Sequence, residues 1–119
     1  LQSLREGFQG GTVMEAFGPG GEAYASYDAM VKAVYDNAWQ MPHDLTDASA
    51  TCKVRVTIAS NGDVLSAIIV SPSGHGSLDA SVRRVLSAVK FVAPFPQGAK
   101  EKQRTYTISF NLKSKQGIG

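Results

Sequence analysis

The chain has 119 residues, a formal net charge of +2 and a hydrophobic fraction of 43%. This length suits one domain with a small core, and the nearly balanced charge does not indicate a partner such as nucleic acid or a membrane surface. No apolar run approaches the roughly 20 residues of a membrane span, and no signal peptide is visible. Because the sequence starts at Leu1 rather than at Met, we expect a piece of a longer protein.

Residues 1–21 are rich in glycine, with Gly10 and Gly11 followed by Gly-Pro-Gly-Gly at 18–21. Glycine and proline in this density are typical of loops, so the sequence predicts a linker or tether here. We expect a folded domain over residues 22–113 and a frayed tail over 114–119.

Two segments have helical periodicity. The first covers residues 22–39 and ends before Pro42, and we expect Trp39 at its end to pack on a sheet. The second covers residues 77–89, with Ser77 as the expected N-cap and Asp79 in the first turn. Their apolar stripes are formed by Tyr27, Met30, Val31, Val34 and Ala38, and by Leu78, Val82, Val85, Leu86 and Val89.

The stretch 52–71 predicts a β-hairpin around Asn61-Gly62, a strong signal for a two-residue turn of type I′. Such a turn places Ile58 opposite Leu65 and Lys53 opposite Val70. A third strand follows at 104–113, where Tyr106, Ile108, Phe110 and Leu112 alternate with polar residues. Each strand thus has an apolar face that needs a cover.

The predicted fold is α+β, a two-layer sandwich with the element order α-β-β-α-β. A helix between the second and third strands makes these two strands parallel, so the third strand fits beside the first. The expected sheet is antiparallel, has three strands in the order 2-1-3, and carries both helices on one face. The third strand is then an open edge with few charges, which favours the docking of an added strand.

No residue pattern predicts an enzyme, a cofactor or a metal site. The single Cys52 excludes an internal disulfide, and we expect it to be a small residue at a strand start, with an intermolecular bridge or a reactive thiol as the alternative. His43, Asp44 and Asp47 are close in sequence but fall in a loop without a second histidine. His75 lies between glycines and is expected to be a solvated loop residue.

Several short motifs, in this order and spacing, resemble the periplasmic C-terminal domain of the TonB/TolA family. They are Ala-Trp-Gln-Met-Pro at 38–42, Asn-Gly-Asp-Val at 61–64, Ser-Pro-Ser-Gly at 71–74, Leu-Asp at 78–79, Pro-Phe-Pro at 94–96 and the strand 106–112. The resemblance covers about three quarters of the chain, with Gly18–Gly21 in place of the Gln-Pro-rich stretch of some TonB proteins.

The resemblance implies a non-enzymatic coupling domain in the periplasm, tethered to the inner membrane in the full-length protein. It implies association with an ExbB/ExbD-like motor through an N-terminal part outside this sequence. The partner is then an outer-membrane transporter, whose short TonB box adds as a strand to the third strand. The implied partner-binding residues are Arg104, Thr105, Tyr106, Thr107, Ile108, Ser109, Phe110 and Asn111.

Two alternatives remain open. A TolA-like domain would act in envelope integrity with TolQ/TolR, TolB and Pal, although the cysteine pair of some TolA domains is absent here. A self-pairing module would form a homodimer through its edge strands. A nucleic-acid partner is not expected, because the polar face of the predicted sheet carries no aromatic residues.

Overall fold

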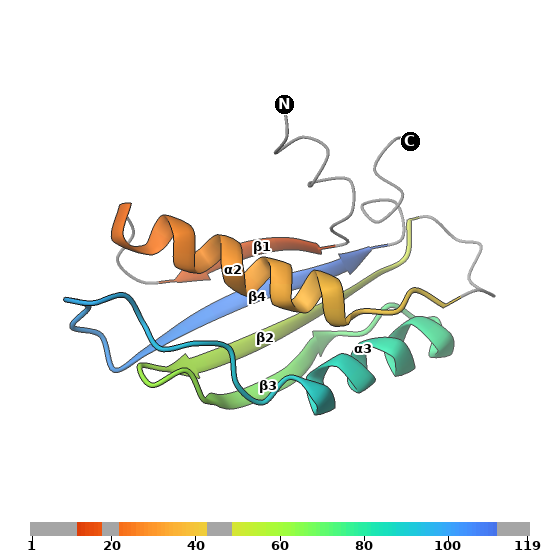
Figure 1. Ribbon diagram of the computed structural model, residues 1–119. Coiled ribbons are helices and arrows are strands. Elements are labelled where there is room, and N and C mark those ends of the chain that lie inside the picture. The colour runs from red at the N-terminus through yellow and green to blue at the C-terminus, as the bar shows by residue number, and fades with distance from the viewer. Residues whose placement is uncertain (1–11, 18–21, 43–48, 112–119) are drawn as a thin grey trace.

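The computed structural model describes residues 12–17, 22–42 and 49–111. Two helices and four strands follow one another along this part of the chain (Figure 1). They are β1 (Thr12–Phe17), α2 (Glu22–Ala38), β2 (Thr51–Ala59), β3 (Val64–Ser71), α3 (Gly76–Ala88) and β4 (Gln103–Asn111). The strands form one antiparallel sheet in the order β1-β4-β2-β3, and both helices lie on the same face of it.

The predicted α+β class and the two helices over one face are confirmed. The prediction of three strands is wrong, because Thr12–Phe17 pairs with β4 and adds a fourth. Residues 12–17 are thus a strand and not part of a linker. Residues 12–17 form a strand for a physical reason. The pairing of β2 with β4 leaves the backbone groups on the other side of β4 without hydrogen-bond partners, and β1 supplies them. The other residues of the predicted linker, and those of the predicted tail, lie outside the described residues.

The core lies between the helices and the inner face of the sheet. The predicted α3 stripe is buried, and Trp39 is 2% exposed and packs edge-on against Phe110 at 5.3 Å between ring centroids. The four most buried residues of α2 are spaced three or four residues apart, so they share one face of the helix. They are Tyr24, Tyr27, Val31 and Tyr35. Beneath them lie Cys52, Val54, Val56, Ile58, Tyr106, Ile108 and Phe110, all with no exposed surface.

The turn of the β2–β3 hairpin differs from the predicted type I′ turn. Only Gly62 has a positive φ, of 97°, and a type I′ turn needs positive φ at Asn61 as well. Ala59 and Asp63 close a three-residue loop, so Ile58 pairs with Val64 instead of Leu65. An irregularity at Leu65 then restores the predicted pairing from Thr57–Ser66 to Val54–Ile69, and a second one leaves Lys53 opposite Ser71.

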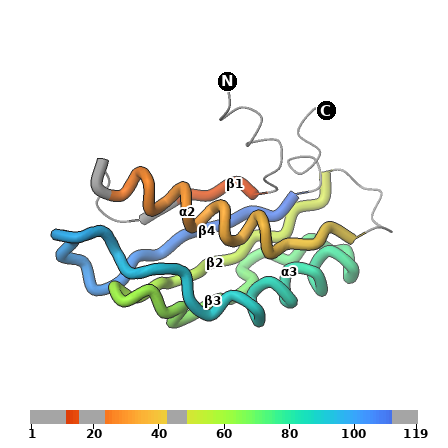
Figure 2. The backbone as a smooth tube through the Cα atoms, in the orientation of Figure 1, coloured from red at the N-terminus to blue at the C-terminus, as the bar shows by residue number. Residues whose placement is uncertain are grey.

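The segment after α3 runs back past this turn, as Figure 2 traces. Val92 N–H donates to the Gly62 C=O and Phe95 N–H donates to the Ser60 C=O, both at 2.9 Å. The Phe95 ring packs edge-on against Tyr24 and Tyr27. The return segment therefore fastens the hairpin turn to α2.

The start of α3 also differs from prediction. The helix begins at Gly76, so Ser77 lies inside it and His75 holds the capping position. Asp79 accepts a hydrogen bond from Ser73 N–H at 2.9 Å, and the Ser73 hydroxyl accepts one from His75 N–H at 3.0 Å. Neither described helix is long and apolar enough to cross a membrane.

Candidate partner-binding edge

The orientation of the β4 backbone follows from one bond and a regular register. Ser60 N–H donates to the Lys102 C=O at 2.9 Å, and β2 pairs with β4 without a shift from Thr51–Asn111 to Ala59–Gln103. Bonded and non-bonded pairs alternate in an antiparallel ladder. The even-numbered residues of β4 therefore bond to β2. The odd-numbered Thr105, Thr107 and Ser109 direct their N–H and C=O groups to the opposite side.

The side chains of β4 are held firmly on the helix face. Arg104, Tyr106, Ile108 and Phe110 are all buried. Arg104 forms an ion pair with Asp28 of α2 at 3.2 Å, and its guanidinium lies 4.0 Å from the centre of the Tyr24 ring. The Tyr106 hydroxyl donates to Asp28 at 2.5 Å. These contacts fix α2 and β4 as one unit, so the strand predicted to bind a partner is rigidly supported.

Burial governs the ionisation of this cluster. It raises the pKa of the Tyr106 hydroxyl, and the hydrogen bond to the Asp28 carboxylate raises it further. Burial also raises the pKa of Tyr24 to about 12, helped by its hydrogen bond to Glu101. Both phenols thus keep their protons at neutral pH, and the tyrosines act as hydrogen-bond donors to carboxylates.

The outward side of β4 is occupied by β1. Val13 pairs with Ser109 and Glu15 with Thr107, which are residues whose backbone groups point away from β2. The prediction that the last strand is an open edge is therefore wrong in this structure. The residues predicted to bind a partner do form one strand, Gln103–Asn111, but β1 already lies where an added strand would lie.

β1 is held to the domain by few side chains. Thr12 is buried and its hydroxyl donates to Asp36 at 2.5 Å, and Asp36 also binds Lys32 at 2.7 Å. Met14 is half-buried against the core, whereas Val13 is 56% exposed and Glu15 is exposed. Of the β1 side chains that the structure describes, none belongs to the buried apolar core, and Met14 packs against it. Release of β1 would therefore uncover the part of the core that Met14 contacts.

The sequence signal for β1 was weak but present. Its six residues, Thr-Val-Met-Glu-Ala-Phe, contain Val13, Met14 and Phe17, yet glycines flank them on both sides. A strand of this length is not stable by itself and forms because β4 provides backbone hydrogen-bond partners for it. That requirement is non-local, and only the register of the sheet reveals it.

The other candidate groups do not form a chemical site. Cys52 is fully buried. Burial, together with the neighbouring Asp79 carboxylate, raises the pKa of the Cys52 thiol to about 12. This favours the predicted inert core residue over a reactive thiol. Among the described residues, no group of three or more His, Cys, Asp or Glu side chains could hold a metal ion. His43, Asp44 and Asp47 lie outside the described residues, and His75 precedes α3.

Comparison with known proteins identifies a similar fold and a family. The solution NMR structure of TolAIII bound to a peptide derived from the N-terminus of TolB matches with a TM-score of 0.57. The match has 18% sequence identity and covers 76% of this chain and 77% of that chain, so it shows a shared fold. A search of curated proteins gave no match. The family model described as TonB C terminal matches residues 24–110, from α2 through β4, and the chain therefore belongs to the TonB C-terminal family.

Proposed function

We propose that this domain couples the two membranes of a bacterial envelope by binding an extended segment of an outer-membrane transporter along β4. In this role it sits in the periplasm, is tethered to the inner membrane by a preceding part of the protein, and transmits the work of an ExbB/ExbD-like motor. Its contribution is binding rather than catalysis. The observation that carries the proposal is the outward backbone of Thr105, Thr107 and Ser109, which already accepts one added strand.

The structure adds a condition to this proposal, because β1 occupies the edge. A transporter segment would replace β1, exchanging one set of backbone hydrogen bonds for another. Each such bond contributes only about 0.5–1.5 kcal/mol net, so an exchange between strands of similar length is nearly balanced. Among the described side chains of β1, only Thr12 and Met14 hold the strand to the domain, which supports an exchange of strands.

Strand addition suits a coupling role for a physical reason. The backbone supplies the contacts, so the transporter segment needs little side-chain specificity, and one domain can serve several transporters. The rigid attachment of β4 to α2 through Arg104, Asp28 and Tyr106 gives a pulling force a firm path into the domain.

The test is a pair of substitutions at Thr107, monitored by amide NMR during titration with a synthetic TonB-box peptide. Thr107→Pro removes an N–H group that faces β1 and leaves the bonds to β2 in place. Because β1 would lose the same bond as the peptide, the comparison is made in a parent chain that carries Val13→Pro/Glu15→Pro, which removes the β1 N–H groups that face β4. In this parent we expect Thr107→Pro to weaken peptide binding by about tenfold or more, which corresponds to about 1.4 kcal/mol. Thr107→Ala keeps the N–H group, and we expect its affinity to stay within about twofold of the parent chain.

A folded Thr107→Pro protein that binds the peptide as tightly as the parent chain would exclude this edge. The same titration distinguishes the TolA-like alternative, with which the shared fold of the TolAIII structure is compatible. A peptide from the N-terminus of TolB would then shift the amide signals, whereas the TonB-box peptide would leave them unchanged.

A further inference from the structure

The opposite edge of the sheet offers a second surface of a different kind. β3 pairs only with β2 among the described strands, and its eight residues include no charged side chain. Leu65, Ile68 and Val70 are 57%, 53% and 39% exposed. By contrast, the outer strand β1 carries the exposed Glu15 at its middle, which is how edges are commonly protected from pairing. β3 lacks this protection.

The free backbone groups of β3 can be assigned. Ala59 N–H donates to the Asp63 C=O, so the odd-numbered residues of β2 bond toward β3. Their partners Ser66 and Ile68 are therefore bonded inward. Ala67 and Ile69 turn their N–H and C=O groups outward, and no described residue forms a hydrogen bond with them.

The outer edge of β3 already accepts a short piece of chain at one end. Val64 N–H donates to the Lys90 C=O at 2.9 Å, and Asp63 forms an antiparallel bridge with Phe91. The pairing stops there, because the chain preceding Lys90 is helix α3. The edge is thus shaped to accept a strand and is only partly used.

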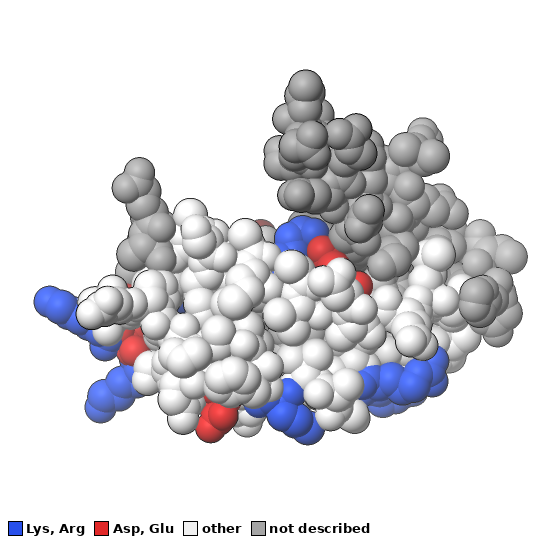
Figure 3. Space-filling model, viewed as in Figure 1, with Lys and Arg blue, Asp and Glu red and all other residues white. Residues whose placement is uncertain are grey.

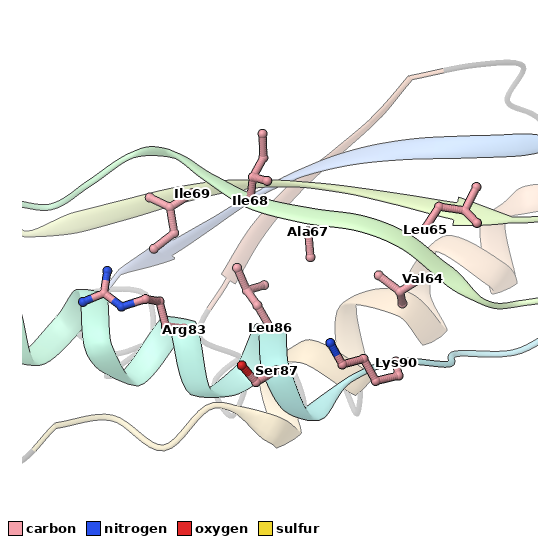
Figure 4. A pocket seen from close by; sticks show the side chains of 9 residues that line it. All are labelled: Val64, Leu65, Ala67, Ile68, Ile69, Arg83, Leu86, Ser87 and Lys90. Atoms are coloured by element: carbon pink, nitrogen blue, oxygen red, sulfur yellow. The ribbon is translucent and has the colours of Figure 1, made fainter.

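A groove of about 480 Å³ runs between β3 and α3 beside these free groups (Figure 4). Val64, Ala67 and Ile69 enter it from β3, and Leu86 rises from α3 opposite Ala67. Arg83 lies at the Ile69 end and Lys90 at the Val64 end. Neither cationic side chain forms an ion pair with any described residue, although the charge of Arg83 acts on Asp79, which precedes it on α3. Figure 3 shows several groups of Lys and Arg atoms along the lower edge of the molecule, with acidic atoms between them.

The geometry points to a second docking site, in which β3 and the groove bind an extended acidic segment of a partner protein. The outward groups of Ala67 and Ile69 would pair with its backbone. Alternate side chains would enter the groove in the order acidic, apolar, acidic, to meet Arg83, Leu86 and Lys90. Side chains four residues apart on a strand are about 13 Å apart. Arg83 lies in α3 and Lys90 lies beyond the helix end at Ala88, and both side chains line the groove.

Charge selects this occupant over a second copy of the chain. A symmetric dimer through β3 would bring together two grooves with the same cationic rims, because equivalent surfaces meet across a two-fold axis. Opposite charge has to come from a different chain. This site lies on the far edge of the sheet from β4, with β2 between them, so both could be occupied together.

The test uses a capped heptapeptide with glutamate at its second and sixth positions, valine at its fourth and threonine elsewhere, titrated into the full chain. We expect amide shifts in β3 and around Arg83–Lys90, with the signals of β4 unchanged. The Arg83→Glu/Lys90→Glu double variant should lower the affinity for the peptide by about tenfold or more. The control is Arg84→Glu/Lys53→Glu, which changes the net charge by the same amount and should lower the affinity by about twofold at most. Ile69→Pro should abolish the shifts, and Ile69→Val should retain them.

The proposal is overturned if the peptide gives no shifts in β3, or if the two double variants bind it equally. It is also overturned if a peptide with lysine in place of glutamate binds as well as the acidic one. Concentration-dependent broadening of β3 signals without peptide, together with dimer formation in sedimentation, would assign the edge to a second copy instead. None of these outcomes depends on the TonB-box titration at β4, so the two proposals fail separately.

Discussion

At the residue scale, Gly62 is the position with the least freedom to change. Its φ of 97° is rarely adopted by residues with a side chain. A Cβ atom built there would lie 2.6 Å from the Ala93 backbone carbon and 2.8 Å from the Phe91 ring. The return segment therefore packs directly on the glycine, and its hydrogen bond to the Gly62 C=O depends on this close approach.

Gly62→Ala is expected to lower the free energy of unfolding by about 3 kcal/mol, because it combines an unfavourable φ with a clash against backbone. Gly74→Ala is the matched control. Gly74 has a similar φ of 87°, but nothing lies within 4 Å of the position that its new methyl group would occupy, so only about 1 kcal/mol is expected. Urea unfolding of the three proteins with a common slope measures the difference. Equal losses at the two glycines would show that the contact with Ala93 does not constrain the turn.

The turn also shows where sequence-based prediction stops at this scale. Asn61-Gly62 correctly located the hairpin, and the central register from Val54 to Thr57 was confirmed. The turn type was wrong because it depends on the return segment, which binds Ser60 and Gly62 from about 30 residues further along the chain. A local dipeptide preference contains no information about that contact.

At the scale of elements, the start of α3 depends on one carboxylate. Asp79 is 8% exposed, and burial alone would raise its pKa. The hydrogen bonds from Ser73 and the Cys52 thiol, together with the positive charge of Arg83, outweigh burial, so the pKa lies below the ordinary value of 3.8. A pKa lowered by folding contributes stability above pH 3.8, and this stability is lost as the pH falls through the folded-state value.

Asp79→Asn should therefore destabilise the domain by about 1 kcal/mol at pH 7, the usual effect of a helix-start carboxylate. The difference from the parent chain should shrink as the pH falls below about 4, because the parent carboxylate becomes protonated there. Urea unfolding at a series of pH values measures both quantities. A difference that stays constant down to about pH 2 would mean that the charge of Asp79 has no part in holding α3.

The elements themselves were predictable to different degrees. The two helices and three of the strands have strong periodicity or a clear turn signal, and the structure confirms them. β1 was missed because its six residues have little local signal and gain their structure from β4. The strand proposed as the binding site was thus predicted correctly, whereas its open edge was not.

At the scale of the whole molecule, the sheet has two edges with different properties. The β1 edge covers the backbone groups of β4, and Thr12 and Met14 hold it to the domain. The β3 edge is apolar and uncharged and is flanked by Arg83 and Lys90. Under the two proposals, the domain exchanges one strand and adds another while its helices and central strands stay in place.

The exchange of β1 for a partner strand is the central claim, and a reversible lock tests it most directly. Val13 and Ser109 are paired across β1 and β4, so Val13→Cys/Ser109→Cys places two thiols within reach of a disulfide, while the buried Cys52 stays protonated. Affinity for the TonB-box peptide is measured on the same protein before and after reduction. We predict that the oxidised protein binds about tenfold more weakly or not at all, and that reduction restores binding. Equal affinity in the two states would contradict the claim, because the peptide would then bind without displacing β1.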